Sequence, residues 1–356
     1  MFFIPDDDIR KAGAFHGEEG LAWIERLPAI LVNCEKRWSL SFALPFVYQT
    51  YAYHYIAPAL QSDGTAVVVK VHAPTGEFTQ EAEALRLFDG HGMVRLLDYD
   101  VNDKALLLER LEPGTPLCEL EDDDEATSLA ATVMRQLWRP APPVHPFPSV
   151  IDWGRGFTRL RQYYKGGNGP FPAALLQEAE SLFAELSASM TESVLLHGDL
   201  HHENILAAER APWLGIDPKG VIGEPAYETG ALLRNRLPNL LDAPQAVRVL
   251  KRRIDHLSEE LNLDRTRVRN WAMAQAVLSV WWTIEDGGSI SDDDLTCAEL
   301  LVEHRASLAG GCVVALPFRK QVRQLHPWDQ CLTMVRARLP EYSHDEDHHV
   351  ARRFRS

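Results

Sequence analysis

The stretch that decides the fold is residues 197–204, His-Gly-Asp-Leu-His-His-Glu-Asn, followed at residues 216–218 by Ile-Asp-Pro. Asn204 stands five positions after Asp199, and Asp217 stands thirteen positions after Asn204. The group sits between apolar runs, and each of the three side chains carries an oxygen that can accept a hydrogen bond or bind a cation. The three residues therefore form a candidate site.

The spacing of Asp199, Asn204 and Asp217 is that of a phosphoryl-transfer site of the protein-kinase type. A γ-phosphoryl group leaving ATP needs an acceptor hydroxyl held in line, and it needs magnesium to neutralise the charge on the phosphate oxygens. One Asp can orient the hydroxyl and take its proton. An Asn carbonyl and a second carboxylate supply the oxygen ligands that magnesium prefers.

The local pattern around these residues predicts a short strand and a hairpin. Residues 193–196 form a buried strand, and residues 204–207 and 213–216 form two strands joined by a polar turn. Because residues at the open end of a hairpin are neighbours, we expect Asn204 and Asp217 to lie close together. The alternative, that each motif is only a turn with a capping carboxylate, explains either motif alone but not their joint spacing.

The overall composition indicates a sizeable folded core. The chain has 356 residues, which suits one large domain or two lobes, with 46% hydrophobic and 24% charged residues. A net charge of −15 argues against a nucleic-acid partner, whose phosphates require a basic face. It is compatible with a small cationic substrate, although an acidic surface that only maintains solubility explains it equally well.

The sequence also predicts the cellular compartment. Residues 1–10 hold three aspartates and no basic segment before an apolar run, so we expect no signal peptide. The most apolar stretch, residues 42–60, contains Pro45 and Pro58 and does not predict a membrane span. We therefore expect a cytoplasmic protein, with its oligomeric state left open. The five cysteines have no paired spacing that would indicate disulfides or a zinc site: Cys34, Cys118, Cys297, Cys312 and Cys331.

The N-terminal third, residues 1–108, predicts a small sheet with helices. Residues 16–38 have helical spacing with a break at Pro28, and residues 77–89 form a second helix. The predicted strands are residues 46–58, 66–71, 93–97 and 105–108, with Asp63-Gly64 as a hairpin turn. The order is therefore a hairpin, a helix and two further strands, which we expect to form a small antiparallel sheet with one helix on it.

Residues 109–114 interrupt this pattern and are predicted to be a hinge linker. Residues 115–303 are predicted to be mostly helical apart from the hairpin that leads to Asp217. The predicted helices are residues 126–137, 175–187, 226–237, 246–261 and 268–286. The last of these carries Trp271, Trp281 and Trp282, which we interpret as core packing rather than a substrate wall. Residues 304–356 lose the helical pattern and are typical of a disordered C-terminal extension.

Lys70 closes a β-branched run and is the candidate cation for the nucleotide phosphates. A kinase-type site needs a carboxylate from the next helix to hold this lysine. Glu81 shares a helical face with Leu85 and Phe88, so it is expected to face the core, whereas Glu83 is expected to be solvated. The alternative for Lys70 is a strand lysine that only extends its ammonium to solvent.

Residues 195–235 resemble the aminoglycoside phosphotransferase family, and more narrowly its streptomycin 6-kinase and hydroxyurea kinase branch. The HGDLHHEN and IDPKG motifs carry most of the resemblance. Supporting matches occur at residues 63–70, 81–85, 93–97 and 106–111, so that the resemblance covers roughly residues 20–303.

The resemblance implies an α+β, two-lobed protein-kinase-like fold with ATP between the lobes. It implies that the adenine lies against the linker from Glu109 to Leu111, where backbone groups make the contacts. It also implies Asp199 as the residue that orients the acceptor hydroxyl, and Asn204 and Asp217 as Mg²⁺ ligands. The Asp-Pro-Lys sequence at residues 217–219 stands where protein kinases have Asp-Phe-Gly.

Two features depart from the family pattern. Residues 48–59 contain no glycine, so no G-x-G-x-x-G loop covers the phosphates. Glu228 stands where the family usually has the Asp that buttresses the catalytic loop, and its longer side chain puts that brace in doubt.

We expect an enzyme that uses Mg²⁺ and ATP to phosphorylate an aminoglycoside hydroxyl, with streptomycin as the expected acceptor. The alternatives are a kinase of hydroxyurea or another small hydroxylated metabolite, and an ATP-binding pseudokinase. Choline-type kinases use the same three residue types, Asp, Asn and Asp, in these roles. The residues that flank them in this chain resemble the aminoglycoside branch more closely.

A polycationic acceptor predicts an acidic pocket, for which Glu224, Glu285 and Asp286 are candidates. The competing interpretation is that Glu224 caps a helix and that the other two residues form a solvated helix end.

Overall fold

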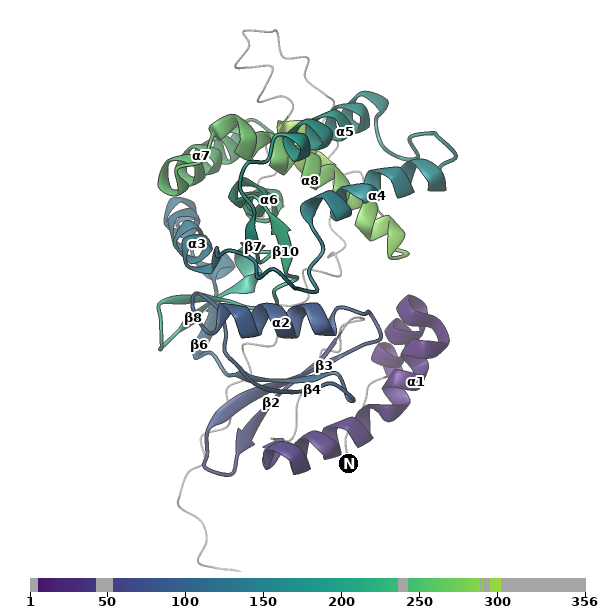
Figure 1. The fold of residues 1–356 in the computed structure, drawn as a ribbon, viewed down its shortest axis with the longest axis vertical. Helices are drawn as coiled ribbons and strands as arrows, with labels where there is room; N and C mark the ends of the chain where they lie inside the picture. Colours follow the sequence, from purple (N-terminus) through teal and green to yellow (C-terminus); the bar gives the residue numbers. More distant parts are fainter. Residues whose placement is uncertain (1–5, 43–53, 236–242, 289, 291–294, 302–356) are drawn as a thin grey trace, which may run out of the picture.

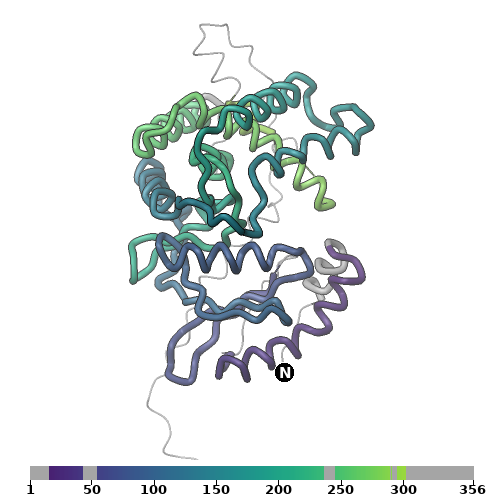
Figure 2. Tube along the Cα trace, in the orientation of Figure 1, coloured from purple at the N-terminus to yellow at the C-terminus, as the bar shows by residue number. Residues whose placement is uncertain are grey.

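The computed structural model describes residues 6–42, 54–235, 243–288, 290 and 295–301, with side chains for all of these except residues 6–15 and 243–244. A sheet with two helices forms one part of the molecule, and a mostly helical region forms the other (Figure 1). The chain colours separate in the same way, with purple and blue in the sheet part and teal to yellow in the helical part (Figure 2). The predicted extension, residues 304–356, lies outside the described residues.

The N-terminal part is built on a five-stranded antiparallel sheet in the order β1-β2-β3-β5-β4. Its strands are β1 (Leu40–Phe42), β2 (His54–Gln61), β3 (Ala66–His72), β4 (Leu96–Asp100) and β5 (Ala105–Glu109). The predicted turn between β2 and β3 is confirmed, with Gly64 at a φ of 88°. Glycine adopts this left-handed backbone without steric cost.

The two faces of the sheet carry different helices because strand side chains alternate. Val67, Val69 and Val71 are buried on the side covered by α1 (Asp6–Trp38). Val68 and Lys70 point to the other side, which is covered by α2 (Phe78–Phe88). The face that carries Lys70 is therefore the face that meets α2 and the helical part (Figure 1).

The predicted break at Pro28 is wrong. Pro28 lies inside α1, and the non-helical residue is Gly17, with φ 57° and ψ −137°. Proline removes one helical hydrogen bond, but Leu27 and Leu31 are buried against the sheet and keep this turn helical. Gly17 can take a conformation that other residues rarely adopt.

The helical part contains two short sheets and a bundle of helices. The strands are β6 (Pro113–Pro116), β7 (Val194–Leu196), β8 (Ile205–Ala208), β9 (Trp213–Gly215) and β10 (Val221–Gly223). The α-helices are α3 (Asp123–Leu137), α4 (Val150–Tyr163), α5 (Ala173–Ala188), α6 (Pro225–Arg234), α7 (Ala243–Leu261) and α8 (Arg265–Glu285). Single 3₁₀ turns are η1 (Leu117–Glu119) and η2 (His202–Asn204).

The predicted β8–β9 hairpin is present, and β6 adds to it in the order β6-β8-β9. The C-terminal end of the expected linker, residues 109–114, therefore begins a strand that pairs with the hairpin instead of remaining irregular. The lobe boundaries at residues 108 and 115 stay a prediction. β10 pairs with β7 in a separate two-stranded sheet.

The interpretation of the α8 tryptophans as core residues is confirmed for Trp271 and Trp281, which are buried. Trp282 is partly buried against the same core. The Trp271 ring lies 5.1 Å from the rings of both Phe183 and Tyr227, in edge-on contact. Within the described residues, no helix is long and apolar enough to cross a membrane.

Candidate active site

Two sets of hydrogen bonds fix the backbone of the loop that follows β7. The backbone N–H groups of His197 and Gly198 donate to the carboxylate of Glu228, at 2.7 and 2.9 Å. The backbone N–H groups of Lys219 and Gly220 donate to the carbonyl of His197, at 2.9 and 3.1 Å. The brace that the longer Glu228 side chain put in doubt is therefore present.

A glycine is required at the start of this loop. Gly198 has a φ of 89°, and an added Cβ would lie 2.8 Å from the Trp153 ring. Both the backbone conformation and the close packing exclude a larger side chain. The sharp turn then directs Asp199 away from β7.

His197 is a buried, uncharged part of this framework. Its Nε2 lies 2.8 Å from the carbonyl of Ile216, so Nε2 donates, and its Nδ1 accepts from the backbone N–H of Asp199 at 3.2 Å. Burial lowers the pKa of His197 to about 4. The imidazole therefore fixes the loop to the end of β9 without adding charge.

Asp199 is a largely buried carboxylate surrounded by cationic groups. Its Oδ1 accepts from Arg234 at 2.7 Å, and its Oδ2 lies 3.8 Å from Nε2 of His201. Burial would raise the pKa of Asp199, but His201, Arg234 and Lys219 outweigh it and lower that pKa. Asp199 is therefore ionised at neutral pH.

Asn204 and Asp217 are brought to the same end of the hairpin, as the sequence predicts. The backbone N–H of Ile216 donates to the carbonyl of Asn204 at 2.9 Å. The Nδ2 of Asn204 donates to the carbonyl of Asp199 at 2.9 Å, so its Oδ1 is the atom suited to bind a cation. Asp217 has a φ of 61°, a strained left-handed conformation that is typical of functional sites.

Lys70 lies between the carboxylates of Glu81 and Asp217. Its ammonium donates to the two oxygens of Glu81 at 2.8 and 2.7 Å, and to Oδ1 of Asp217. Burial opposes the charge on Lys70, but the two carboxylates outweigh it and raise the pKa of this lysine. Glu83 instead pairs with Arg86 on the outer face of α2. Glu81 rather than Glu83 therefore pairs with Lys70, as the sequence predicts.

The charge of Asp217 is maintained in the same way. Burial would raise its pKa, but the ammonium groups of Lys70 and Lys219 hold that pKa well below its ordinary value. Lys219 donates to Glu77 at 3.2 Å, and its own pKa is raised because Glu77 and Asp217 outweigh the effect of burial. The site therefore presents a fully ionised carboxylate.

Two buried histidines lie behind the Lys70–Glu81 pair. Nε2 of His72 is 2.9 Å from Oε2 of Glu81, without the alignment of an ordinary hydrogen bond. The His54 ring packs on His72 at a centroid distance of 4.3 Å. These three side chains offer ligand atoms within 4.8 Å of one another. Because both Glu81 oxygens already bind the Lys70 ammonium, a metal ion there would lie close to a positive charge.

The side chain of Glu109 braces the linker rather than facing a ligand. It accepts from the backbone N–H of Arg95 at 2.9 Å and pairs with Arg210 in the β8–β9 turn. Arg210 also donates to the carbonyls of Gly90 and Met93, at 2.8 and 2.9 Å. Leu111 packs against the main core. The side chains of Glu109 and Leu111 are thus engaged within the protein, and backbone contacts between this segment and adenine stay a prediction.

The expectation that Glu224, Glu285 and Asp286 form an acidic pocket is not supported by their contacts. Glu224 is buried, accepts from Arg267 at 2.7 and 3.0 Å, and also accepts from the indole N–H of Trp271. Glu285 is paired with Arg159, and Asp286 is exposed at the end of α8. Cationic side chains therefore already pair with Glu224 and Glu285, and a role of these residues in an acceptor pocket stays a prediction.

Four residues of this region received no role from the sequence: His72, His201, Lys219 and Arg234. His72, His201 and Lys219 each stand two positions after a recognised motif residue. The sequence does not show where their side chains point, because that depends on how the loop and the hairpin fold. His201 binds Glu203 at 2.7 Å, and Asp199 and Glu203 raise the pKa of His201 against the effect of burial. The signal that could have found Lys219 is its place inside Ile-Asp-Pro-Lys.

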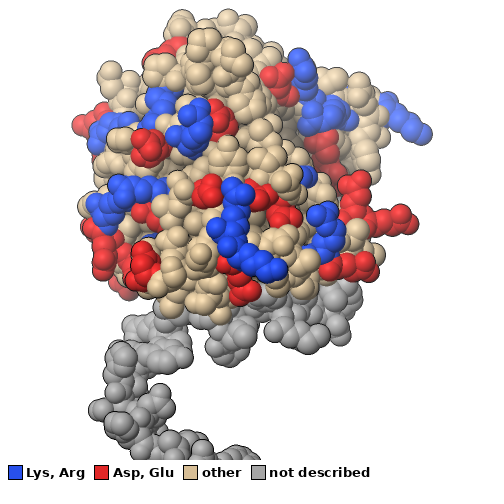
Figure 3. Space-filling view, turned by 60° about the horizontal axis from the view of Figure 1, so that its bottom comes forward, with Lys and Arg blue, Asp and Glu red and all other residues tan. Residues whose placement is uncertain are grey.

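The surface charges are mixed on the face shown in Figure 3. Lys and Arg side chains alternate with Asp and Glu in small groups over the described part of that face. The net negative charge of the sequence is therefore not gathered there into one acidic patch.

Known proteins match this chain over most of its length. A model of the aminoglycoside/hydroxyurea antibiotic resistance kinase family matches residues 46–287. The streptomycin 6-kinase of Streptomyces griseus is 35% identical over 314 residues, which cover 84% of this chain and 97% of that relative. The hydroxyurea phosphotransferase of Kitasatospora aureofaciens is 33% identical over 304 residues, which cover 84% of this chain and 86% of that relative.

A solved structure shares the fold at much lower identity. Aminoglycoside phosphotransferase APH(4)-Ia, in a ternary complex with ADP and hygromycin B, has a TM-score of 0.53 at 15% identity, and covers 76% of this chain and 97% of its own. The expected two-lobed protein-kinase-like fold is thereby confirmed. The chain belongs to the aminoglycoside/hydroxyurea antibiotic resistance kinase family and is a small-molecule kinase.

Proposed function

We propose that the protein transfers the γ-phosphoryl group of ATP, with Mg²⁺, to a hydroxyl of a streptomycin-type aminoglycoside, and that it confers resistance by inactivating the drug. The observation that carries this proposal is the convergence of Asp199, Asn204, Asp217 and the Lys70–Glu81 pair around one loop. The 35% identity to a streptomycin 6-kinase supports the choice of acceptor.

The donor set fits a nucleotide-bound magnesium ion. Asp217 supplies an ionised carboxylate and Asn204 an amide oxygen, and magnesium prefers hard oxygen ligands of this kind. When bound, the ion would neutralise charge on the phosphate oxygens. Lys70, held by Glu81, would then contribute its positive charge to the phosphates. The ADP in the complex of the related fold supports the use of ATP.

Asp199 would orient the acceptor hydroxyl. As the acceptor oxygen forms its bond to the γ-phosphorus, the bond from that phosphorus to the β–γ bridging oxygen breaks and ADP leaves. The hydroxyl proton passes to Asp199. A carboxylate with a lowered pKa suits orientation more than early deprotonation, which agrees with a loose transition state in which the phosphoryl group carries most of the charge.

Hydroxyurea is the second candidate acceptor. A hydroxyurea phosphotransferase is 33% identical to this chain, close to the value for the streptomycin kinase. The ion pairs of Glu224 and Glu285 also remove two carboxylates that could have supported a polycationic acceptor. The expected cytoplasmic location remains a prediction for either acceptor.

Acceptor-dependent ADP release tests the proposal. The purified full-length protein is assayed with Mg²⁺ and ATP against streptomycin, other aminoglycosides and hydroxyurea, with Asp199→Asn as the inactive control. NMR then identifies the phosphorylated position. ADP release that depends on streptomycin supports the proposal. Release that depends only on hydroxyurea favours the second acceptor, and no release with any of these acceptors contradicts both.

A further inference from the structure

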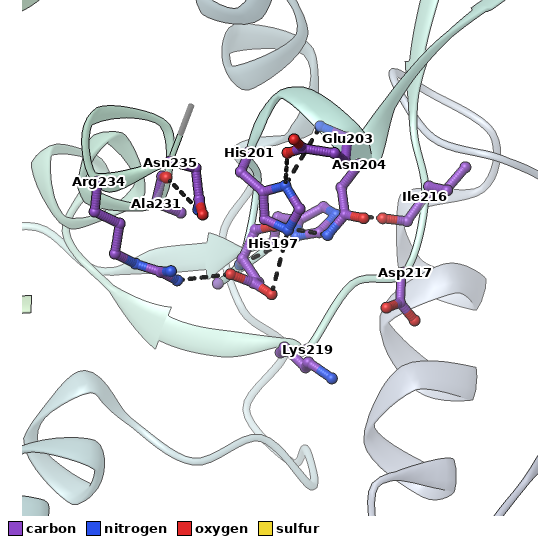
Figure 4. Close-up of polar contacts among 12 residues, drawn as sticks. His197, His201, Glu203, Asn204, Ile216, Asp217, Lys219, Ala231, Arg234 and Asn235 are labelled. Carbon is purple, nitrogen blue, oxygen red and sulfur yellow. Dashed lines mark hydrogen bonds and ion pairs between the residues drawn. The ribbon is translucent and has the colours of Figure 1, made fainter. Parts of the chain in front are cut away.

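Arg234 makes a direct contact with the carboxylate of Asp199. It lies in the last turn of α6, and its Nη2 donates to Oδ1 at 2.7 Å. The side chains of Arg234 and Asp199 are 17% and 15% exposed, so water screens this pair only partly. Figure 4 shows the guanidinium pointing from α6 toward the loop.

The helix that carries Arg234 is itself fixed to the loop. Glu228, six positions earlier on α6, accepts the backbone N–H groups of His197 and Gly198. At the other end, the carbonyl of Asn235 accepts from Arg253 at 3.3 Å, and Arg253 pairs with Asp123 on α3. The guanidinium is thus presented by a helix that is anchored on both sides of it.

The contact divides the two oxygens of Asp199 between two tasks. Arg234 donates to Oδ1, whereas Oδ2 lies 3.8 Å from Nε2 of His201. A hydroxyl in hydrogen-bond distance of Oδ2 needs the carboxylate plane to stay fixed, and a charge-assisted bond to the other oxygen provides this.

The position of Arg234 also has a cost. Its Nε is buried without a hydrogen-bond partner among the described residues, although a buried N–H normally finds an acceptor. The guanidinium is held through Nη2 instead, by its ion pair with Asp199.

We propose that Arg234 is a positioning residue for phosphoryl transfer: its guanidinium holds Oδ1 of Asp199 and so presents Oδ2 to the acceptor hydroxyl. This inference rests on the proposed function. It assigns no contact between Arg234 and the nucleotide, so the substitution acts on the transfer step rather than on ATP binding.

Kinetics of Arg234 variants give the first test, in the full-length protein with the acceptor found in the panel assay. Arg234→Ala is expected to lower kcat about 100-fold, because a misplaced catalytic group costs about this much, while the KM for ATP stays unchanged. The kcat of Arg234→Lys is expected to lie between the values for the wild type and Arg234→Ala. The control is Arg159→Ala, which removes another arginine–carboxylate pair, that with Glu285, and does not involve Asp199. Its kcat should equal that of the wild type.

Rescue by a small cation separates positioning from a general structural effect. Millimolar guanidinium is expected to raise the kcat of Arg234→Ala and to leave wild-type and Arg159→Ala rates unchanged, and ammonium is expected to be a poor substitute because it lacks the planar donor pair. A kcat above half of the wild-type value in Arg234→Ala overturns the inference. So does a rise in the KM for ATP as large as the loss in kcat.

Thermal unfolding tests the pair without any acceptor. Arg234→Ala leaves the Asp199 carboxylate without its partner, so it is expected to lower Tm, and adding Asp199→Asn is expected to restore part of that loss. Equal Tm losses from Arg234→Ala with and without Asp199→Asn show that the two side chains do not interact, and this overturns the inference. If the wild type phosphorylates no acceptor although the Tm coupling is found, the proposed function fails, and the positioning role of Arg234 in phosphoryl transfer fails with it.

Discussion

The carboxylate of Glu228 accepts the backbone N–H of Gly198 at 2.9 Å, and this contact ties α6 to the loop that carries Asp199. Glu228 is 1% exposed and also accepts the N–H of His197. Burial, with the nearby charge of Asp199, raises the pKa of Glu228 to about 7, although the two N–H groups act against this. The brace of the loop is therefore sensitive to pH.

This pKa predicts how stability changes with pH. The folded-state pKa of about 7 lies above the ordinary value of 4.5, so folding favours the protonated form. The stabilisation is complete below pH 4.5 and is lost as pH rises through 7, by up to about 3 kcal/mol. Glu228→Gln removes the ionisation, so its unfolding free energy should not show this part of the decline. Urea titrations at pH 5 and pH 8 measure the difference, with Glu83→Gln as control. Parallel behaviour of wild type and Glu228→Gln would contradict the assignment.

Asp199→Asn should leave nucleotide binding nearly intact and reduce turnover strongly. The amide keeps the shape of the side chain but cannot take the acceptor proton, and a general base typically contributes about 10²–10⁴-fold. Steady-state kcat and a separate ATP-binding titration measure the two quantities. If the variant keeps more than about a tenth of the wild-type kcat, Asp199 does not have this role.

Lys70→Ala should raise the KM for ATP or lower kcat, and Glu81→Gln should reproduce part of the effect. Both oxygens of Glu81 bind the Lys70 ammonium, whereas Glu83 binds Arg86 at the surface. Glu83→Gln is therefore the matched control on the same helix and should be nearly silent. ATP saturation curves of the three variants provide the measurement. A larger change in KM or kcat for Glu83→Gln than for Glu81→Gln would contradict the conclusion that Glu81 holds Lys70.

Asp217→Ala and Asn204→Ala should both weaken the magnesium dependence of activity, and Asp217→Ala should do so more. Asp217 brings a full charge to the cation, whereas Asn204 brings only a dipole. Magnesium titrations at saturating ATP show the shift in the activating concentration. A wild-type titration curve in both variants would mean that neither residue binds the metal.

Glu224→Gln should destabilise the protein without changing the KM for the acceptor. Glu224 joins Arg267 and Trp271 of α8 to the start of α6, and losing hydrogen bonds to a buried charged group costs about 2 kcal/mol. Thermal unfolding and acceptor kinetics on the same preparation separate the two effects. An increased acceptor KM with unchanged stability would instead support the earlier prediction that Glu224 lines the acceptor pocket.

The spacing of Asp199, Asn204 and Asp217 could be interpreted from the sequence because a strand, a loop and a hairpin are local structures. The position of Glu81 could be predicted because helical periodicity defines which side of α2 is buried. By contrast, Arg234 meets Asp199 across 35 positions of sequence. No local pattern describes where the end of one helix lies relative to a loop.

Helix α4 is absent from the helices predicted from the sequence, and this has a different physical cause. Gly154 and Gly156 disfavour a helix locally, yet an added Cβ would lie 2.1 Å from Phe183 at the first position and 2.6 Å from Leu278 at the second. These glycines allow α4 to pack closely on α5 and α8. Close helix packing thus requires the residues that a sequence-based prediction counts against a helix.

The strand that the linker forms has a consequence for how distances in the site are maintained. β6 continues from the linker and pairs with β8, and the backbone N–H of Val94 donates to the carbonyl of Gly215 at 2.8 Å. The segment proposed to bind adenine and the hairpin that ends at Asp217 are therefore joined by main-chain hydrogen bonds. A nucleotide bound at the linker would therefore meet the proposed metal ligands, Asn204 and Asp217, at a separation that these main-chain hydrogen bonds fix.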